Sequence, residues 1–259
     1  MESIPIVISG SGSMGRQVAL AAAVDPGTTP LAFIDALSQE ESCEGLPLYR
    51  EAALALDTHM PEVVVDFSNA EWTPVIARAA LERGIRLVIG TTGLPADFLE
   101  ELQAEAKTRE VGVVLAPNFA IGAILLMHFA RQAAKFFDNA EIIELHHAGK
   151  VDAPSGTAKT TAEQMVQARG KPFERVEADF QTVPGTRGGE VDGVTLHSVR
   201  LPGLVAHQEV LFGGLGQTLS LRHDSTGRDS FMPGVLAAVK AVREEQGLVV
   251  GLEKLFGLS

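Results

Sequence analysis

Short apolar runs and longer, helix-like stretches alternate along the first half of the chain. The runs are too short for helices and rich in β-branched residues, so they predict buried strands. We expect strands at residues 4–9, 31–35, 63–67, 85–90 and 111–116, and helices at residues 14–24, 74–83 and 96–109. This β-α-β alternation indicates an α/β fold with a parallel sheet that is covered by helices on both faces.

The pattern changes after Pro117, where longer predicted strands follow a pair of predicted helices along the chain. We expect helices at residues 121–137, 155–169 and 233–245, and strands at residues 141–147, 194–201, 208–212 and 217–222. Glycine and proline turns separate the last three strands. The second half therefore predicts an α+β unit with an open mixed sheet.

Composition and charge narrow the classes of function. Hydrophobic residues make up 46% of the chain, which is enough for a sizeable core, and the net charge of −12 would repel a nucleic acid. The single cysteine, Cys43, excludes an internal disulfide and a thiol metal site, so we expect no bound metal and a reducing cytoplasm. The start of the chain does not resemble a signal peptide, and Gly122 and His128 interrupt the most apolar stretch. We expect no membrane partner.

A glycine-rich turn follows the first predicted strand and opens the first predicted helix. It reads Gly10-Ser11-Gly12-Ser13-Met14-Gly15, a G-x-G-x-x-G pattern. In such a turn the glycines allow a tight bend, close approach to a pyrophosphate and close helix–strand packing. Asp35 ends the next strand about 20 residues later, where a carboxylate binds ribose hydroxyls. The pattern predicts a Rossmann dinucleotide site, with an ordinary turn and a strand-end aspartate as the alternative.

Three further loops follow predicted strands of the same sheet. They carry Phe67, then Gly90, Thr91 and Thr92, then Ala116, Pro117, Asn118 and Phe119. Ligands of open parallel sheets bind at the carboxyl ends of the strands. We therefore expect these loops to line the nicotinamide side of the dinucleotide site. The alternative is that each loop only connects a strand to the next helix.

The most informative segment runs from Glu144 to Ala158. It places His146, His147 and Lys150 at the end of a strand, just before a predicted helix that begins near Ser155, Gly156 and Thr157. Free N–H groups at a helix start, two hydroxyls and a lysine make a site for an anion. A small dicarboxylate is the substrate that suits this group.

The segment resembles the H-H-x-x-K-x-D-A-P-S-G-T-A signature of the dihydrodipicolinate reductase family, whose members are 4-hydroxy-tetrahydrodipicolinate reductases. The resemblance extends over the whole chain and includes the glycine turn, the loops at 90–93 and 116–119, Ser198-Val199-Arg200, Gly203, His207 and Arg228. It implies hydride transfer from NAD(P)H to a cyclic dicarboxylate in the diaminopimelate route to lysine. It also implies a dinucleotide-binding domain of residues 1–117 and 228–259, a substrate-binding and oligomerisation domain of residues 118–227, and a homotetramer.

The resemblance also implies roles for single residues. His146 is expected to be the general acid that protonates the substrate ring, and Lys150 to bind a substrate carboxylate and stabilise charge in the transition state. Ser155, Gly156 and Thr157 are expected to form the carboxylate-binding turn. His147 is expected to contact the substrate, unless strand alternation turns it away. Arg228 is expected near the cofactor.

The residues favour NADH over NADPH, with NADPH still usable. Members that prefer NADPH carry an arginine in the glycine turn and a basic residue after the second strand. This chain has Ser13 in the turn, and no cation follows Asp35 before Gln39. A 2′-phosphate would lie beside the Asp35 carboxylate without a partner, unless Arg16 reaches it.

Two other functions remain open from the residues alone. Another two-domain Rossmann dehydrogenase of amino or semialdehyde acids would keep the glycine turn but would not need the segment from His146 to Thr157. A covalent semialdehyde enzyme would also need an active-site cysteine, and Cys43 is misplaced for that. A non-catalytic dinucleotide sensor would leave His146 and Lys150 unexplained.

Overall fold

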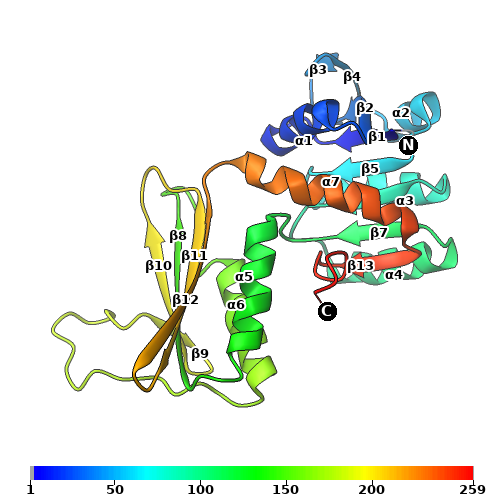
Figure 1. Cartoon of the computed structure of the whole chain (residues 1–259). Helices are drawn as coiled ribbons and strands as arrows, with labels where there is room; N and C mark the ends of the chain where they lie inside the picture. The colour runs from blue at the N-terminus through cyan, green and yellow to red at the C-terminus, as the bar shows by residue number, and fades with distance from the viewer. Residues whose placement is uncertain (1–2, 259) are drawn as a thin grey trace. The chain divides into compact units, whose positions relative to one another are not determined.

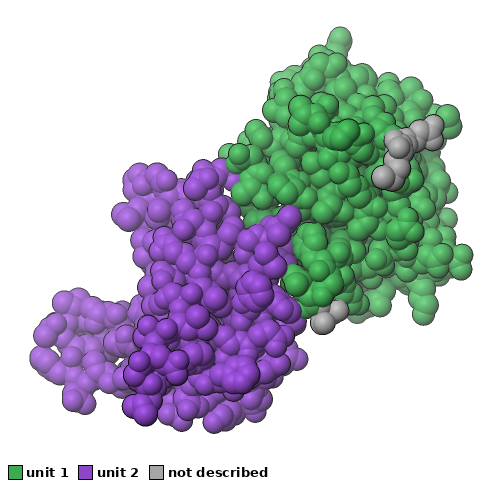
Figure 2. Space-filling model, viewed as in Figure 1, with its two compact units in different colours: residues 1–120, 228–259 green, residues 121–227 purple. Residues whose placement is uncertain are grey.

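The computed structural model describes residues 3–258, which form two compact units (Figure 2). Unit 1 contains the residues up to Ala120 together with those from Arg228 onward, and unit 2 contains Ile121–Gly227. Residues 1, 2 and 259, which the predicted dinucleotide-binding domain includes, lie outside the described part. Among residues 3–258, none of the helices has both the length and the apolar character that crossing a membrane requires.

Unit 1 is built on one eight-stranded sheet with the order β13-β7-β6-β5-β1-β2-β4-β3 (Figure 1). Its strands are β1 (Ile4–Ser9), β2 (Thr28–Ile34), β3 (Ser42–Cys43), β4 (Leu46–Tyr49), β5 (Val63–Asp66), β6 (Arg86–Ile89), β7 (Gly112–Leu115) and β13 (Gly247–Val250). Neighbouring strands are parallel except for β3 and β4. The predicted parallel sheet is thereby confirmed.

Helices cover both faces of this sheet. They are α1 (Ser13–Val24), α2 (Ala52–His59), α3 (Thr73–Glu82), α4 (Ala96–Thr108) and α7 (Met232–Ala241), with short 3₁₀ turns η1 (Arg228–Phe231) and η2 (Val242–Glu244). Apolar side chains of α2, α3 and α4 share one buried cluster with one face of the strands, and α1 packs against α7. The strand order reverses at β1, which lies between β2 and β5. The glycine turn after β1 therefore sits at the switch point where open α/β sheets bind ligands.

Unit 2 has a five-stranded sheet with the order β12-β11-β8-β10-β9. Its strands are β8 (Asn139–His146), β9 (Gly189–Val191), β10 (Val194–Arg200), β11 (Ala206–Gly214) and β12 (Gln217–Ser225). β10 pairs with β8 in parallel, and the other pairs are antiparallel, so the predicted mixed sheet is confirmed. The helices α5 (Ile121–Ala133) and α6 (Gly156–Arg169) pack together and form one apolar cluster with one face of the sheet.

Two predicted helices are too long. The helix expected to reach residue 137 ends at Ala133, and a turn follows in which Phe136 is exposed, so its apolar side chain does not continue the buried stripe. The helix expected to reach residue 245 ends at Ala241 and passes through η2 into β13, because the chain there returns to pair with β7. The pattern also missed α2, β3, β4, β9 and β13, all of which are short.

Candidate active site and dinucleotide site

The glycine turn of unit 1 has the close contacts that its pattern predicts. Gly10 has φ 97°, and a Cβ there would lie 2.7 Å from the Phe67 carbonyl oxygen. A Cβ on Gly15 would lie 1.9 Å from the Gly10 carbonyl oxygen, so α1 packs directly on the turn. Among residues 3–258, no atom lies within 4 Å of a Cβ position on Gly12. The turn is therefore closed on its packed side and open at Gly12, at the N-terminus of α1, where a pyrophosphate fits.

A cavity of about 490 Å³ lies beside this turn, and Asp35 is among the residues that line it. Its lining includes the predicted residues Gly10, Gly12, Asp35 and Phe67, and eight others: Ser11, Ala36, Leu37, Ser38, Ser68, Asn69, Glu71 and Trp72. A volume of this size suits the adenosine half of a dinucleotide. The cavity and the open turn together fit the predicted cofactor.

The Asp35 carboxylate is held by its neighbours. Ser11 donates to Oδ2 through its N–H at 2.9 Å and its hydroxyl at 2.6 Å, and the Leu37 N–H donates to Oδ1 at 3.1 Å. Partial burial acts to raise the pKa of Asp35, but the hydrogen bonds from Ser11 and the following turn outweigh it, so the pKa is lowered. Asp35 is therefore a carboxylate at neutral pH.

Two arginines donate hydrogen bonds to the chain segments on either side of this carboxylate. Arg16 donates from Nε to the Ser11 carbonyl oxygen, and its Nη atoms pair with Glu40 at 2.9 Å and Glu44 at 3.3 Å. Arg50 donates to the Ser38 carbonyl oxygen at 2.9 Å and to Gln39 Oε1 at 3.4 Å, both neutral acceptors. The sequence reading considered Arg16 but missed Arg50, which follows the unpredicted strand β4.

A second cavity of unit 1, of about 360 Å³, is lined by the predicted residues Met14, Phe67, Gly90, Thr91 and Thr92, with Ser68, Asn69 and Ala70. Behind it, the fully buried Asp66 carboxylate accepts hydrogen bonds from the hydroxyls of Thr91, Ser68 and Thr73 at 2.6–2.8 Å. A Cβ on Gly90 would lie 2.1 Å from the Phe67 ring, so any larger residue there would displace that ring. Packing and Asp66 fix this wall of the cavity.

The other predicted cofactor residues do not line either cavity. Ala116 and Phe119 are buried, and the Phe119 ring packs on Phe67 with centroids 5.4 Å apart. Asn118 accepts a hydrogen bond from the Ala120 N–H. Ser13 is the exposed first residue of α1, Arg228 is exposed at the start of η1, and Pro117 belongs to the turn after β7.

In unit 2, His146 is the last residue of β8 and shares a face with Glu144, because side chains two residues apart on a strand point to the same side. His146 Nδ1 lies 2.5 Å from Glu144 Oε2. The Glu144 side chain is 1% exposed and that of His146 is 15% exposed. Burial lowers the pKa of His146 and the charges of Lys150 and Arg200 act in the same direction, whereas Glu144 acts to raise it; the net result is a lowered pKa.

The turn after β8 carries the other predicted residues. Lys150 Nζ is paired with Asp152 Oδ1 at 2.7 Å, and the Lys150 N–H bonds to the His147 carbonyl oxygen. His147 itself is exposed just beyond the strand. Lys150 therefore presents a cation held by one half-exposed carboxylate, which an anionic ligand can replace.

The predicted anion turn forms the start of α6. Ser155 is its N-cap, accepting from the Ala158 N–H at 3.1 Å, while its own N–H donates to Glu144 Oε1 at 3.1 Å. Gly156 is exposed and Thr157 is half-buried in the first turn of the helix. The unit thus gathers an imidazole, an ammonium group and a helix N-terminus, which together can bind an anion and transfer a proton.

Sequence reasoning gave no role to Glu144 or Arg200. Arg200 donates to both oxygens of Glu144, each at 2.8 Å, from the neighbouring strand β10. The position of Glu144, two residues before His146 in a strand, was the one available signal. Arg200 was visible only as part of the family resemblance.

Comparison with known proteins identifies the same relatives for both units. Residues 4–119 match the family model of the N-terminus of dihydrodipicolinate reductase, and residues 122–256 match that of its C-terminus. The chain is 45% identical over 265 residues to 4-hydroxy-tetrahydrodipicolinate reductase of Moorella thermoacetica, covering 98% of each chain. It is 45% identical to that of Streptococcus pneumoniae, covering 98% of this chain and 99% of the relative.

Solved structures include a near match and more distant ones. The dipicolinate-bound dihydrodipicolinate reductase from Paenisporosarcina sp. TG-14 has a TM-score of 0.89 and 37% identity, and the match covers 98% of this chain and 99% of that one. Scyllo-inositol dehydrogenase from Lactobacillus casei with bound NAD(H) and scyllo-inositol has a TM-score of 0.64 at 14% identity, over 99% and 94% of the two chains. The second likeness shows a shared fold alone.

Proposed function

The chain belongs to the dihydrodipicolinate reductase family, and from this premise we propose that His146 and Lys150 of unit 2 carry the reduction of 4-hydroxy-tetrahydrodipicolinate. It is an oxidoreductase of the diaminopimelate route to lysine, with a Rossmann-type dinucleotide-binding fold. The gathering of His146, Lys150 and the start of α6 at the end of β8 is the observation that carries the proposal. The relative solved with dipicolinate supports a small cyclic dicarboxylate as the ligand of this site.

When bound in unit 1, NAD(P)H supplies the hydride. Lys150 exchanges Asp152 for a substrate carboxylate, and the free N–H groups of Gly156 and Thr157 at the start of α6 bind a carboxylate as well. The substrate hydroxyl leaves as water together with a proton from the neighbouring ring carbon. Hydride then adds to the ring carbon that carried the hydroxyl, and His146 donates its proton to the ring carbon beside it. The net reaction consumes one hydride and one proton and yields tetrahydrodipicolinate, so one proton donor in the site is sufficient.

A proton donor must be protonated before it reacts, and the lowered pKa of His146 disfavours this in the free site. Substrate binding changes the balance. Burial makes the free imidazolium a stronger acid, whereas a bound dicarboxylate adds negative charge that favours the protonated form. Lys150 then stabilises the charge that the ring gains before protonation. The site is therefore expected to protonate His146 on substrate binding and to deprotonate it during turnover.

The cofactor preference follows from the charges around Asp35. The ionised Asp35 can accept a hydrogen bond from a free ribose 2′-hydroxyl but would repel a 2′-phosphate. Arg16 is engaged by Glu40 and Glu44, so its charge is already paired. NADH is the preferred cofactor in this proposal. Arg50, held by neutral acceptors, is the cation that keeps NADPH usable.

We also propose that the chain forms a homotetramer through the sheet of unit 2. On β8 and β11, buried residues alternate with partly exposed ones, because α5 and α6 cover one face of this sheet. Ile143, Leu145 and Leu211 lie among the partly exposed residues. A second copy packed on this face would bury them.

A turnover assay with enzymatically generated substrate tests the function. We expect NADH to be consumed only when the substrate is present, and dipicolinate to bind to unit 2 in calorimetry with loss of affinity in Lys150→Ala. Binding of NADH without turnover would favour the sensor alternative. Turnover of other amino or semialdehyde acids alone would favour the other dehydrogenases.

A further inference from the structure

A single buried carboxylate, that of Glu144, connects the proposed proton donor to the rest of unit 2. Its Oε2 contacts His146 Nδ1 at 2.5 Å and Arg200 Nη1 at 2.8 Å. Its Oε1 accepts from Arg200 Nη2 at 2.8 Å and from the Ser155 N–H at 3.1 Å. One side chain thus holds the imidazole, an arginine and the first residue of the carboxylate-binding turn.

Arg200 keeps Glu144 in its charged form. Burial of Glu144 acts to raise its pKa, but the hydrogen bonds from Arg200, Ser198 and His146 outweigh this, so the pKa is lowered. Arg200 is in turn fixed by the carbonyl oxygens of Val199 and Asp152. The bidentate geometry leaves Glu144 little freedom to rotate away from His146.

A charged carboxylate has no proton to give, so the hydrogen of the His146–Glu144 contact belongs to Nδ1. The proton that His146 releases must then be the one on Nε2. We propose that Glu144, held by Arg200, is the positioning residue that fixes the tautomer of His146 and maintains its basicity, so that Nε2 is the proton donor. The proposal rests on the role of His146 stated above, since a positioning residue acts only through the group it orients.

The groups that act on His146 come from three elements. Glu144 precedes it on β8, Arg200 is its register partner on β10, and Lys150 lies on the following turn, paired with Asp152. On the other side, its register partner on β11 is the uncharged Ala206. Glu144 is thus the anion in contact with His146, and the two cations oppose its effect.

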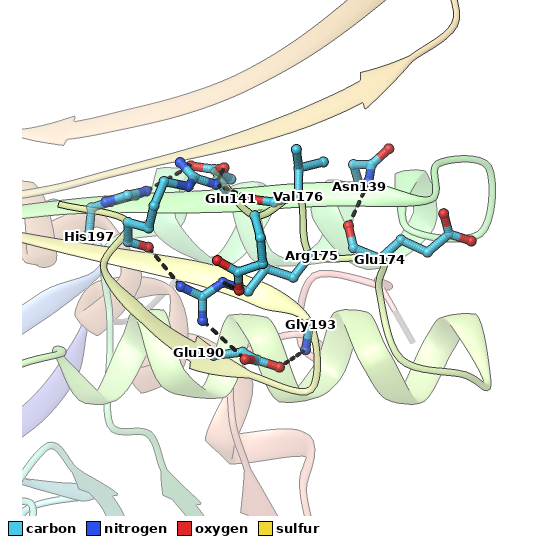
Figure 3. A network of polar contacts seen from close by, with 10 residues as sticks. Asn139, Glu141, Glu174, Arg175, Val176, Glu190, Gly193 and His197 are labelled. Carbon is cyan, nitrogen blue, oxygen red and sulfur yellow. Dashed lines mark hydrogen bonds and ion pairs between the residues drawn. The ribbon is translucent and has the colours of Figure 1, made fainter. Parts of the chain in front are cut away.

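The chain contains a matched control on the same strand. Glu141 of β8 pairs with His197 Nε2 at 2.7 Å (Figure 3). It also pairs with Arg187, so it likewise joins a histidine to an arginine. Three residues before Glu144, it points to the opposite face of the sheet. Glu141→Gln therefore removes the same kind of interaction without touching His146.

The experiment uses the full-length protein with isotopically labelled histidine. The pKa and tautomer of His146 are measured by NMR, and its resonance is assigned by its loss in His146→Gln. We expect the neutral parent ring to carry its proton on Nδ1. In Glu144→Gln the pKa of His146 should fall by about one unit or more, because an adjacent anion is lost. In Glu141→Gln it should stay unchanged.

Kinetics give the second readout. In Glu144→Gln we expect kcat to fall by on the order of 10² with KM nearly unchanged, and the alkaline limb of kcat/KM to move to lower pH. Glu144→Asp, which retains the charge, should give intermediate values and covers the case in which Glu144→Gln does not fold.

An unchanged pKa and tautomer of His146 in folded Glu144→Gln would overturn the proposal, and so would an equal effect of Glu141→Gln. If the NMR shift appears but the kinetic limb does not move, Glu144 still positions the ring, and it is the role of His146 as proton donor that fails.

Discussion

Replacing Arg200 by methionine should destabilise unit 2 strongly. The Glu144 side chain is 1% exposed and that of Arg200 is 19% exposed, and two hydrogen bonds of 2.8 Å join them. Methionine fills part of the volume but leaves Glu144 buried without its cation. Breaking one side of a buried ion pair costs about 3–5 kcal/mol, because the remaining charge is uncompensated. We expect the free energy of unfolding of unit 2 to fall by about this amount.

The pH dependence of this loss in unfolding free energy shows whether the unpaired Glu144 carboxylate causes it. In the parent the pKa of Glu144 is lowered, so the group stabilises the fold above its unfolded pKa of about 4.3 and this stability is lost as the pH falls. In Arg200→Met, burial without the arginine should raise the folded pKa above the unfolded value. Glu144 then destabilises the fold at neutral pH and ceases to do so as it is protonated. The difference between variant and parent should therefore shrink from pH 7 toward pH 5.

The assay must report on unit 2 itself. The single tryptophan, Trp72, and the single tyrosine, Tyr49, both lie in unit 1, so intrinsic fluorescence does not follow unit 2. Hydrogen exchange of β8 and β10 under increasing urea, read by mass spectrometry, resolves it. Arg222→Met, which removes an exposed arginine from Asp224 and Glu209, is the control and should cost much less. A loss in Arg200→Met no larger than in this control, or equal at pH 7 and pH 5, would refute the reasoning.

Three further outcomes are expected. Lys150→Ala should lower kcat/KM by about 10- to 100-fold, through both kcat and KM, because a charged hydrogen bond to the substrate is lost. The control Lys171→Ala removes an exposed lysine paired with Asp138 and should leave the kinetics unchanged. Equal kinetics of the two variants would exclude Lys150 as a substrate-binding residue. The parent should show a higher kcat/KM with NADH than with NADPH, and Glu40→Gln with Glu44→Gln should move the ratio toward NADPH about two- to fivefold by releasing Arg16; a parent that prefers NADPH contradicts this. Light scattering should give four times the chain mass of 27.4 kDa, and a monomer mass would contradict the proposed tetramer.

The central strands β1, β5, β6 and β7 of unit 1 could be predicted because each is a short, largely apolar run that is buried along almost its whole length. The elements that were missed lack such a signal. α2 has no side-chain cap at Glu51, and it ends at His59 with the C-cap residue Met60, which has φ 42° without being glycine. β13 pairs with β7 across more than 130 residues of sequence, which local periodicity cannot reveal.

The site could be predicted in part. Parallel pairing of β10 with β8, which brings Arg200 beside His146, depends on tertiary contacts and has no local pattern. Arg50 reaches the turn after Asp35 because β4 pairs with β2, and β4 was not predicted. By contrast, the closed and open sides of the glycine turn follow directly from the G-x-G-x-x-G spacing. Motifs within one segment could therefore be predicted from the sequence, whereas side chains that reach the site from distant strands could not.

The most direct test of the central claim is the steady-state kinetics of His146→Gln. Glutamine preserves polarity but has no acidic proton to transfer, and a positioned acid contributes on the order of 10²–10⁴ in rate. We expect kcat to fall within this range, with the KM for 4-hydroxy-tetrahydrodipicolinate remaining close to that of the parent, because the proton is transferred only in the transition state. A folded His146→Gln variant that loses less than about threefold in kcat would contradict the assignment of His146 as the proton donor.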